Sequence, residues 1–355
     1  SGRRAAVRSP TRLFVDPWHA LVLRMECSLQ SHSVMGPGPL LLVHGGAWNI
    51  PDEACPAHRD GLRDALAAGR KPLQKEQAAL TAVTTAGKAL EAHKAFNAGC
   101  GAMLNQDGEA ELDAGVMQGA TLAYGAVLAT RRLAHPVQVA RRLLTEGDGR
   151  VRMLAGDGAE RFAEAQGVGL VANETLVCPR EQQRYERLRA AAEGEHPSRS
   201  FLPGAEALGG ADTVGAVARA ADGRLAAATS TGGTPFKPPG RVGDAPLPGA
   251  GFYADEDVAV SATGWGEAIA ATGLARDVRA HVRSGAAAEM AARRALTRMH
   301  DRVQSPDGAG ATGGCIVVTP TDAAYAFTTP RMARGWTAPA ADTAHWAVEP
   351  TTTPH

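Results

Sequence analysis

The chain has 355 residues, 44% of them hydrophobic, which is enough to form one large domain or two smaller ones. Its 37 Lys and Arg residues balance 37 Asp and Glu residues, so the protein offers no basic field to nucleic acid. No apolar run reaches the ~18 residues that a membrane helix needs. We therefore expect a globular protein that acts without nucleic acid and without a membrane.

The sequence contains five cysteines and no CxxC pair. An odd number without that spacing predicts neither a disulfide framework nor a zinc site, and it favours a cytoplasmic location. The first 34 residues are rich in arginine, and their apolar stretch at residues 18–23 is short and followed by charges, unlike a signal peptide. We expect residues 1–38 to be a disordered N-terminal extension, with either Ser1 or Met35 as the N-terminus.

An apolar strand at residues 39–44 opens the predicted domain. It ends at His44, which we interpret as a packed, hydrogen-bonded residue, and the glycines that follow form a tight turn. The spacing of alanine and leucine predicts helices, and runs of small apolar residues predict strands. In the first half of the chain, helices are expected at residues 52–66, 74–92, from Pro136, at 159–165 and at 180–192, with strands at 111–117 and 121–130.

Thr213 stands at a sharp change in composition. Residues 193–212 are polar and contain several glycines, prolines and serines, which predicts a flexible linker. The run that begins at Thr213 alternates small and apolar residues and is typical of a buried strand. A second strand follows after a turn and ends at Thr231, and a loop rich in glycine and proline then carries Arg241 and Asp244.

A strand at residues 258–263 ends at Thr263, where Gly264 precedes a helix. A hydroxyl at a strand end, backbone N–H groups exposed by glycine and the positive end of a helix dipole together favour an anion or oxyanion site. Glu267 lies in the first turn of that helix, where the dipole alone accounts for a carboxylate. The rest of the chain predicts a helix at residues 286–302, a hairpin at 313–318 and 323–327, and a loosely ordered tail at 337–355.

These hydroxyls have no histidine base in a recognisable Ser-His-Asp arrangement. One solution is a threonine at a chain N-terminus, because its own α-amine has a pKa near ~7.7–8.0 and can accept the proton. Thr213 is internal, so this chemistry requires cleavage of the Asp212–Thr213 bond. The predicted flexible linker gives the released chain end room to move.

Seven short segments carry the chemistry-bearing residues in one order along the chain. They are His44-Gly45-Gly46-Ala47, Phe96-Asn97-Ala98-Gly99, Glu111-Leu112-Asp113-Ala114, Asp212-Thr213-Val214-Gly215-Ala216-Val217, Thr229-Ser230-Thr231-Gly232-Gly233, Gly240-Arg241-Val242-Gly243-Asp244 and Thr263-Gly264-Trp265-Gly266-Glu267. Together, over residues 40–336, they resemble the plant-type asparaginase/isoaspartyl peptidase family of N-terminal-nucleophile hydrolases.

The resemblance implies an α+β fold, a four-layer α-β-β-α sandwich in which two β-sheets pack face to face between helices. It implies a single hydrolase domain at residues 39–336. Self-cleavage before Thr213 would divide this domain into an α chain, residues 39–212, and a β chain, residues 213–336. Two αβ units would then form a homodimer.

The resemblance also implies a catalytic set. Thr213 would be the nucleophile, and Thr231 would hold its hydroxyl and assist the cleavage. Thr263 and the backbone of Gly264 would stabilise the oxyanion, and Asn97 would support that side of the site. These roles give each strand-end hydroxyl a place in one reaction.

Substrate binding is implied for the neighbouring loop and helix. The planar guanidinium of Arg241 would clamp the substrate α-carboxylate with two donors. Asp244 would pair with the substrate α-ammonium, and Gly264 and Gly266 would line the pocket.

Residues 90–100 resemble the sodium-holding loop of the family, although Lys94-Ala95 departs from the family's pattern there, as Gln118 does elsewhere. Backbone carbonyl oxygens suit a hard cation such as sodium, and no organic cofactor is implied. The expected ligands are the carbonyls of Leu90, Glu91, His93, Phe96, Ala98 and Cys100.

The implied reaction is hydrolysis of the side-chain amide of L-asparagine and of β-aspartyl dipeptides, and the sequence does not rank these substrates. One alternative is a glycosylasparaginase-like amidase, whose pocket needs room for a sugar. Another is an uncleaved, non-catalytic homologue that acts as a binding protein.

Overall fold

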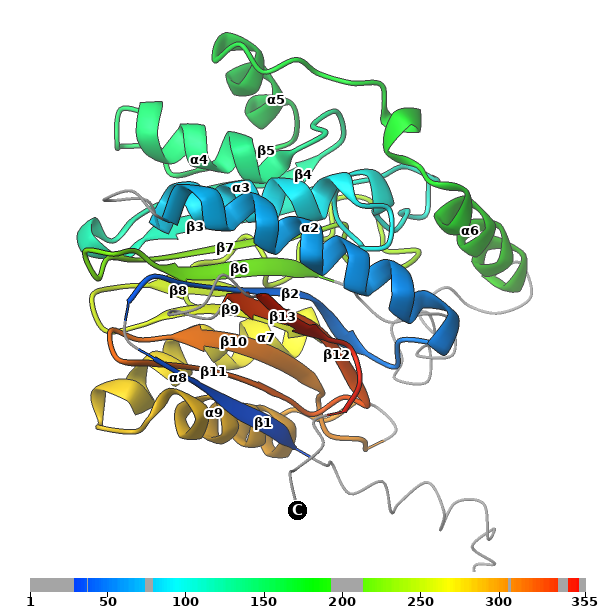
Figure 1. Cartoon of the computed structure of the whole chain (residues 1–355). Coiled ribbons are helices and arrows are strands. Elements are labelled where there is room, and N and C mark those ends of the chain that lie inside the picture. The colour runs from blue at the N-terminus through cyan, green and yellow to red at the C-terminus, as the bar shows by residue number, and fades with distance from the viewer. Residues whose placement is uncertain are drawn as a thin grey trace, which may run out of the picture.

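The computed structural model describes residues 29–36, 38–73, 79–192, 213–305, 308–337 and 344–350. Two β-sheets stack face to face, and helices cover the outer face of each (Figure 1). This arrangement confirms the four-layer α-β-β-α sandwich expected from the sequence. None of the helices in these ranges is long and apolar enough to cross a membrane.

The larger sheet has eight strands, and all neighbours in it are antiparallel except one outer pair, at residues 126–128 and 153–155. Near its centre, the strand that follows Thr213 lies between two long buried strands, which pair with it on either side. In spatial order the strands are β13 (Ala344–Ala347), β12 (Arg331–Thr337), β2 (Leu40–Trp48), β6 (Val214–Arg219), β7 (Leu225–Thr231), β3 (Leu112–Gln118), β4 (Ala123–Thr130) and β5 (Met153–Ala155).

The smaller sheet has five antiparallel strands. In spatial order they are β1 (Gln30–Met35), β11 (Asp322–Phe327), β10 (Gly313–Val318), β9 (Ala259–Gly264) and β8 (Phe252–Ala254).

Helices close both outer faces. In Figure 1 one group lies above the larger sheet, and a second group lies below the smaller sheet. The first group is α2 (Cys55–Leu73), α3 (Ala79–Ala92), α4 (Pro136–Glu146) and α5 (Gly156–Ala165). The second is α8 (Leu274–Arg283) and α9 (Ala288–Arg302), and the short helix α7 (Gly266–Thr272) connects the end of β9 to α8, while α6 (Pro179–Ala192) precedes the predicted linker. Short 3-10 turns are η1 (Asp52–Ala54), η2 (Gly99–Gly101), η3 (Gly119–Thr121) and η4 (Asn173–Leu176).

Alternate side chains of β2 pack into two different hydrophobic clusters. Leu40 and Leu42 belong to the hydrophobic cluster that includes the inner faces of the sheets, whereas Leu41 and Val43 join the cluster beneath the helices. Successive side chains of a strand point to opposite faces, so a strand covered on both sides must be apolar throughout. This is why residues 39–44 read as a continuous apolar run.

The N-terminal boundary differs from the expectation. Residues 30–35, inside the segment that we expected to be disordered, form β1 and pair with β11. The hydroxyls of Ser31 and Ser33 each donate a hydrogen bond to the carboxylate of Glu289 on α9, both at 2.6 Å. A prediction based on apolar residues misses this strand, because its polar side chains are satisfied by a partner more than 250 residues away in the chain.

The C-terminal boundary differs as well. Residues 344–347, within the tail that we expected to be loosely ordered, form β13 and pair with β12 at the edge of the larger sheet. The rings of Trp336 and His345 stack across this pair with centroids 5.4 Å apart. The domain therefore extends beyond residue 336.

Asp212 and the predicted linker at 193–212 lie outside the described residues.

Candidate active site

The ends of three strands bring together the threonines that the sequence singled out. Thr213 immediately precedes β6, Thr231 ends the neighbouring β7, and Thr263 lies near the end of β9 on the facing sheet. All three side chains are buried. The hydroxyl of Thr213 donates a hydrogen bond to Oγ1 of Thr231 at 3.1 Å, which is the contact expected between a nucleophile and the residue that orients it.

The turn after β7 is held from behind by Asn97. The backbone N–H of Gly233 donates to Oγ1 of Thr231 at 3.0 Å. Asn97 donates from Nδ2 to the carbonyl of Gly233 at 2.6 Å and accepts the N–H of Met103 at its Oδ1 at 2.8 Å. Both ends of the Asn97 amide are thus used by backbone, so this residue supports the shape of the turn that carries Thr231.

The opposite side of the site carries two groups suited to stabilising an oxyanion, Thr263 and Gly264. The side chain of Thr263 is fully buried, and its Oγ1 has no hydrogen-bond partner among the described residues. Gly264 has a φ of 133°, and a Cβ there would lie 2.4 Å from Cα of Gly313, so only glycine fits. A buried hydroxyl without a partner is costly, and a bound oxyanion would relieve that cost.

A pair of opposite charges flanks the start of α7. A Cβ on Gly266 would lie 2.8 Å from Oδ1 of Asp244 and 3.0 Å from Nη2 of Arg241. Glycine therefore leaves open the position between the carboxylate and the guanidinium. A carboxylate and an ammonium on one carbon, as in a free amino acid, match these two charges.

The carboxyl group of Asp244 is poised for a cation. Burial raises its pKa from 3.8 to about 7, against the opposing effect of the Arg241 charge, and the charge of Glu267 raises it further. Its Oδ2 has no hydrogen-bond partner within the described parts of the chain. An ammonium group placed beside Asp244 would stabilise the ionised form.

Glu267 contacts Arg241, and the sequence reasoning did not anticipate this ion pair. Its Oε1 accepts hydrogen bonds from Nε and Nη2 of Arg241, at 2.9 and 2.7 Å. We had accounted for this carboxylate by the helix dipole and left it out of the site. Its position directly after Gly266, in a segment that carries other site residues, was the available signal.

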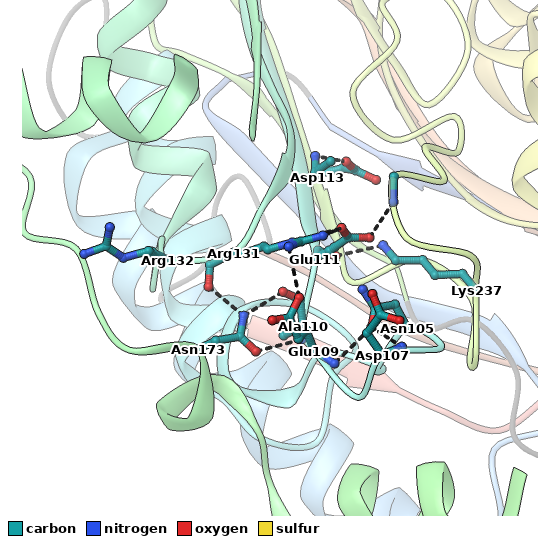
Figure 2. Close-up of polar contacts among 12 residues, drawn as sticks. Asn105, Asp107, Glu109, Ala110, Glu111, Asp113, Arg131, Arg132, Asn173 and Lys237 are labelled. Carbon is teal, nitrogen blue, oxygen red and sulfur yellow. Dashed lines mark hydrogen bonds and ion pairs between the residues drawn. The ribbon is translucent and has the colours of Figure 1, made fainter. Parts of the chain in front are cut away.

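Charged and polar side chains gather around Glu111, next to β3, and Figure 2 shows their contacts. Lys237 is fully buried and donates to the carbonyl of Glu111 at 2.8 Å. Asp113, which pairs with Thr231 in the ladder of β3 and β7, is also fully buried. Burial lowers the pKa of Lys237 and raises that of Asp113, and the attraction between the two charges opposes both shifts. The hydrogen bond from Lys237 to the carbonyl of Glu111 joins the loop after β7 to the residue just before β3, a contact that local sequence did not predict.

The residues expected to hold sodium form a tight loop at the end of α3. A Cβ on Gly99 would lie 2.3 Å from the carbonyl oxygen of Glu91, and one on Gly101 would lie 2.1 Å from that of Phe96. The glycines therefore pack tightly against backbone carbonyls of the loop, and the carbonyls of Leu90, His93 and Ala98 accept hydrogen bonds from backbone N–H groups within it. Within the described ranges, no group of three or more His, Cys, Asp or Glu side chains could hold a metal ion.

The four-layer fold, with a buried pair of threonine hydroxyls at converging strand ends, defines a hydrolase of the N-terminal-nucleophile class. A family model described as asparaginase matches residues 37–345. The chain belongs to the asparaginase family, as the resemblance of its motifs indicated.

Relatives from distant organisms match over most of their length. An isoaspartyl peptidase/L-asparaginase of Xenopus laevis is 40% identical over 309 residues, covering 86% of this chain and 94% of the relative. An isoaspartyl peptidase of Salmonella typhimurium is 41% identical over 311 residues, covering 84% and 94%. An isoaspartyl peptidase/L-asparaginase of Homo sapiens is 38% identical over 315 residues, covering 88% and 96%.

Proposed function

We propose that this chain is an amidohydrolase that cleaves the side-chain amide of L-asparagine and the β-aspartyl bond of isoaspartyl dipeptides. The observation that carries the proposal is the 3.1 Å hydrogen bond from Thr213 to Thr231, together with the buried, unpartnered hydroxyl of Thr263 on a strand of the other sheet. The names of the relatives, isoaspartyl peptidase and L-asparaginase, support this substrate class.

The enzyme first cleaves itself between Asp212 and Thr213. The Thr213 hydroxyl attacks the carbonyl carbon of Asp212, and the C–N bond breaks to give an ester and a free α-amine on Thr213. Water then hydrolyses the ester, which leaves a carboxyl group on Asp212 and restores the hydroxyl. Thr231 orients the Thr213 hydroxyl for this attack.

Substrate hydrolysis uses the same hydroxyl with the new amine as the base. The Thr213 α-amine accepts the hydroxyl proton while Oγ1 attacks the side-chain carbonyl carbon. The hydroxyl of Thr263 and the N–H of Gly264 stabilise the oxyanion. The proton passes to the leaving ammonia or amine, and water then attacks the acyl-enzyme to release aspartate.

The charged side chains beside Gly266 bind the α-carboxylate and α-ammonium groups of the substrate. Arg241 binds the α-carboxylate and Asp244 binds the α-ammonium, and both charges sit next to the position that glycine leaves open. Nucleophile and base reside on one residue, so the reaction calls for no organic cofactor.

Further parts of the proposal concern the ion, the assembly and the location. A sodium ion would be held by the carbonyls of residues 90–100 and would stabilise the loop that carries Asn97. Two αβ units would form a homodimer, as the family resemblance implies. A cytoplasmic location is supported by the free thiols of Cys55, Cys100, Cys178 and Cys315.

The mass of the mature protein tests the mechanism. We expect two chains divided before Thr213, and release of ammonia from L-asparagine and of the amino-terminal aspartate from a β-aspartyl dipeptide. Thr213→Ala should remain one inactive chain, whereas Thr213→Ser, which keeps a hydroxyl, should still cleave. An uncut, fully active enzyme would refute the mechanism. An intact, inactive wild type would indicate a binding protein, and activity confined to glycosylated asparagine would indicate a glycosylasparaginase-like amidase.

A further inference from the structure

A second layer of polar groups lies directly beneath the three threonines of the candidate site. Side chains two residues apart on a strand share a face. Ser261 lies two residues before the threonine of β9, and Thr229 lies two residues before the threonine of β7. On β6 the matching position, two residues after the nucleophile, is Gly215.

These groups form one hydrogen-bonded chain with His44. Nε2 of His44 lies 2.8 Å from Oγ of Ser261, and that Oγ lies 2.8 Å from Oγ1 of Thr229. Thr229 also donates to the carbonyl of Gly251 at 3.2 Å. The three side chains are at most 1% exposed. Because His44 and Thr229 belong to the larger sheet and Ser261 to the smaller one, the chain bridges the two sheets.

Gly215 makes room for this chain. A Cβ at residue 215 would lie 1.9 Å from Oγ of Ser261 and 2.4 Å from Nε2 of His44. Both distances are far below any real contact, so a side chain at this position would displace the imidazole and the hydroxyl. β6 therefore carries a glycine, two residues after Thr213, at the position where His44 and Ser261 make their hydrogen bond.

The imidazole of His44 is held neutral. Burial lowers its pKa to about 3, although the nearby backbone of Thr213 acts in the opposite direction. With its proton on Nε2, the neutral ring donates to Oγ of Ser261, Ser261 donates to Oγ1 of Thr229, and Thr229 donates to the carbonyl of Gly251, so each contact of the chain holds one proton.

We propose that His44, Ser261 and Thr229 are positioning residues that hold the nucleophile of one sheet against the oxyanion groups of the other, a role that rests on the proposed hydrolase function. Thr213 and Thr231 belong to the larger sheet, whereas Thr263 and Gly264 belong to the smaller sheet. Apolar packing between sheets is non-directional, but hydrogen bonds have defined lengths and angles. A misplacement of about 1 Å can lower a catalytic rate about a hundredfold.

Two matched substitutions of Thr229 test the role. Thr229→Val removes the hydroxyl at nearly constant volume, and Thr229→Ser keeps it. We expect the valine variant to lose about ten- to a hundredfold in kcat for L-asparagine and in the rate of self-cleavage. KM should stay within about twofold, because the groups that bind the substrate charges are untouched. The serine variant should recover most of the lost kcat.

The controls separate positioning from simple destabilisation. Tm is measured for each variant, and kcat is counted per cleaved active site. Ser261→Ala, which removes the central hydroxyl and adds no volume, serves if the valine variant does not fold, with the same loss of kcat expected. Wild-type kcat in the valine or alanine variant would overturn the role, as would equal losses in the valine and serine variants. If wild-type protein is itself inactive, it is the proposed function that fails.

Discussion

Replacing Asp244 with asparagine should abolish a binding interaction whose strength depends on pH. The carboxyl group is buried beside Gly266, and burial raises its pKa to about 7. Only its ionised form attracts the substrate ammonium. Asparagine keeps the size of the side chain and removes the charge, so the substitution isolates the electrostatic contribution.

The size of the effect follows from that pKa. With a pKa of about 7, roughly a tenth of Asp244 is ionised at pH 6 and roughly nine tenths at pH 8. The ratio of wild-type to variant kcat/KM for L-asparagine should therefore rise about tenfold between these pH values. At pH 8 the lost charge-assisted hydrogen bond, worth about 1.5–3 kcal/mol, corresponds to a roughly 10- to 150-fold lower kcat/KM. The Thr213 amine titrates in both proteins, so its effect cancels in the ratio.

Stability should change in the opposite direction to activity. The folded pKa of Asp244 lies above its ordinary value of 3.8, so ionisation opposes folding, and the cost grows from about pH 4 and is complete above about pH 7. Asp244→Asn should therefore raise the Tm at pH 8 and leave it nearly unchanged at pH 4. Steady-state ammonia release at several pH values and thermal melts measure both effects. A pH-independent activity ratio, or a lower Tm at pH 8, would refute the reasoning.

Three further outcomes are expected. Glu267→Gln should lower KM for L-asparagine several-fold with kcat nearly unchanged, because Arg241 loses a competing carboxylate; a raised KM would mean that Glu267 holds Arg241 in its binding pose. Gly264→Ala should lower kcat by at least about a hundredfold, since a Cβ there meets Gly313 at 2.4 Å and displaces an oxyanion donor; near-normal kcat would exclude Gly264 from that role. Deleting residues 1–35 should lower the Tm by several degrees, because the edge of the smaller sheet loses its outer strand, and an unchanged Tm in a scanning melt would show that β1 adds no stability.

Much of the site was predictable because its residues occupy recognisable places along the chain. Thr213, Thr231 and Thr263 each stand where an apolar strand meets a loop, and such boundaries are visible in local composition. Arg241 and Asp244 lie in a single glycine-rich loop, so their nearness required no knowledge of the fold. The family resemblance then connected these separate segments into one reaction and predicted the four layers.

Contacts between distant segments were not predictable in the same way. The carboxylate of Glu289 meets Ser31 and Ser33 across more than 250 residues, and β1 was missed for that reason. Lys237 is separated from Glu111 by 126 residues and yet donates to its carbonyl. A polar side chain in the sequence shows that a partner is needed, but it does not show which segment supplies it.

The sequence by itself determined which threonine begins a strand after a polar stretch, and which hydroxyls and charges are available to it. Only the tertiary structure decided that His44 and Thr229 meet Ser261 from the opposite sheet, and that Arg241 turns to Glu267. The physical reason is that strand periodicity fixes the face on which a side chain lies. Which side chains meet across two stacked sheets depends on the register and placement of both sheets, and these emerge only when the whole core packs.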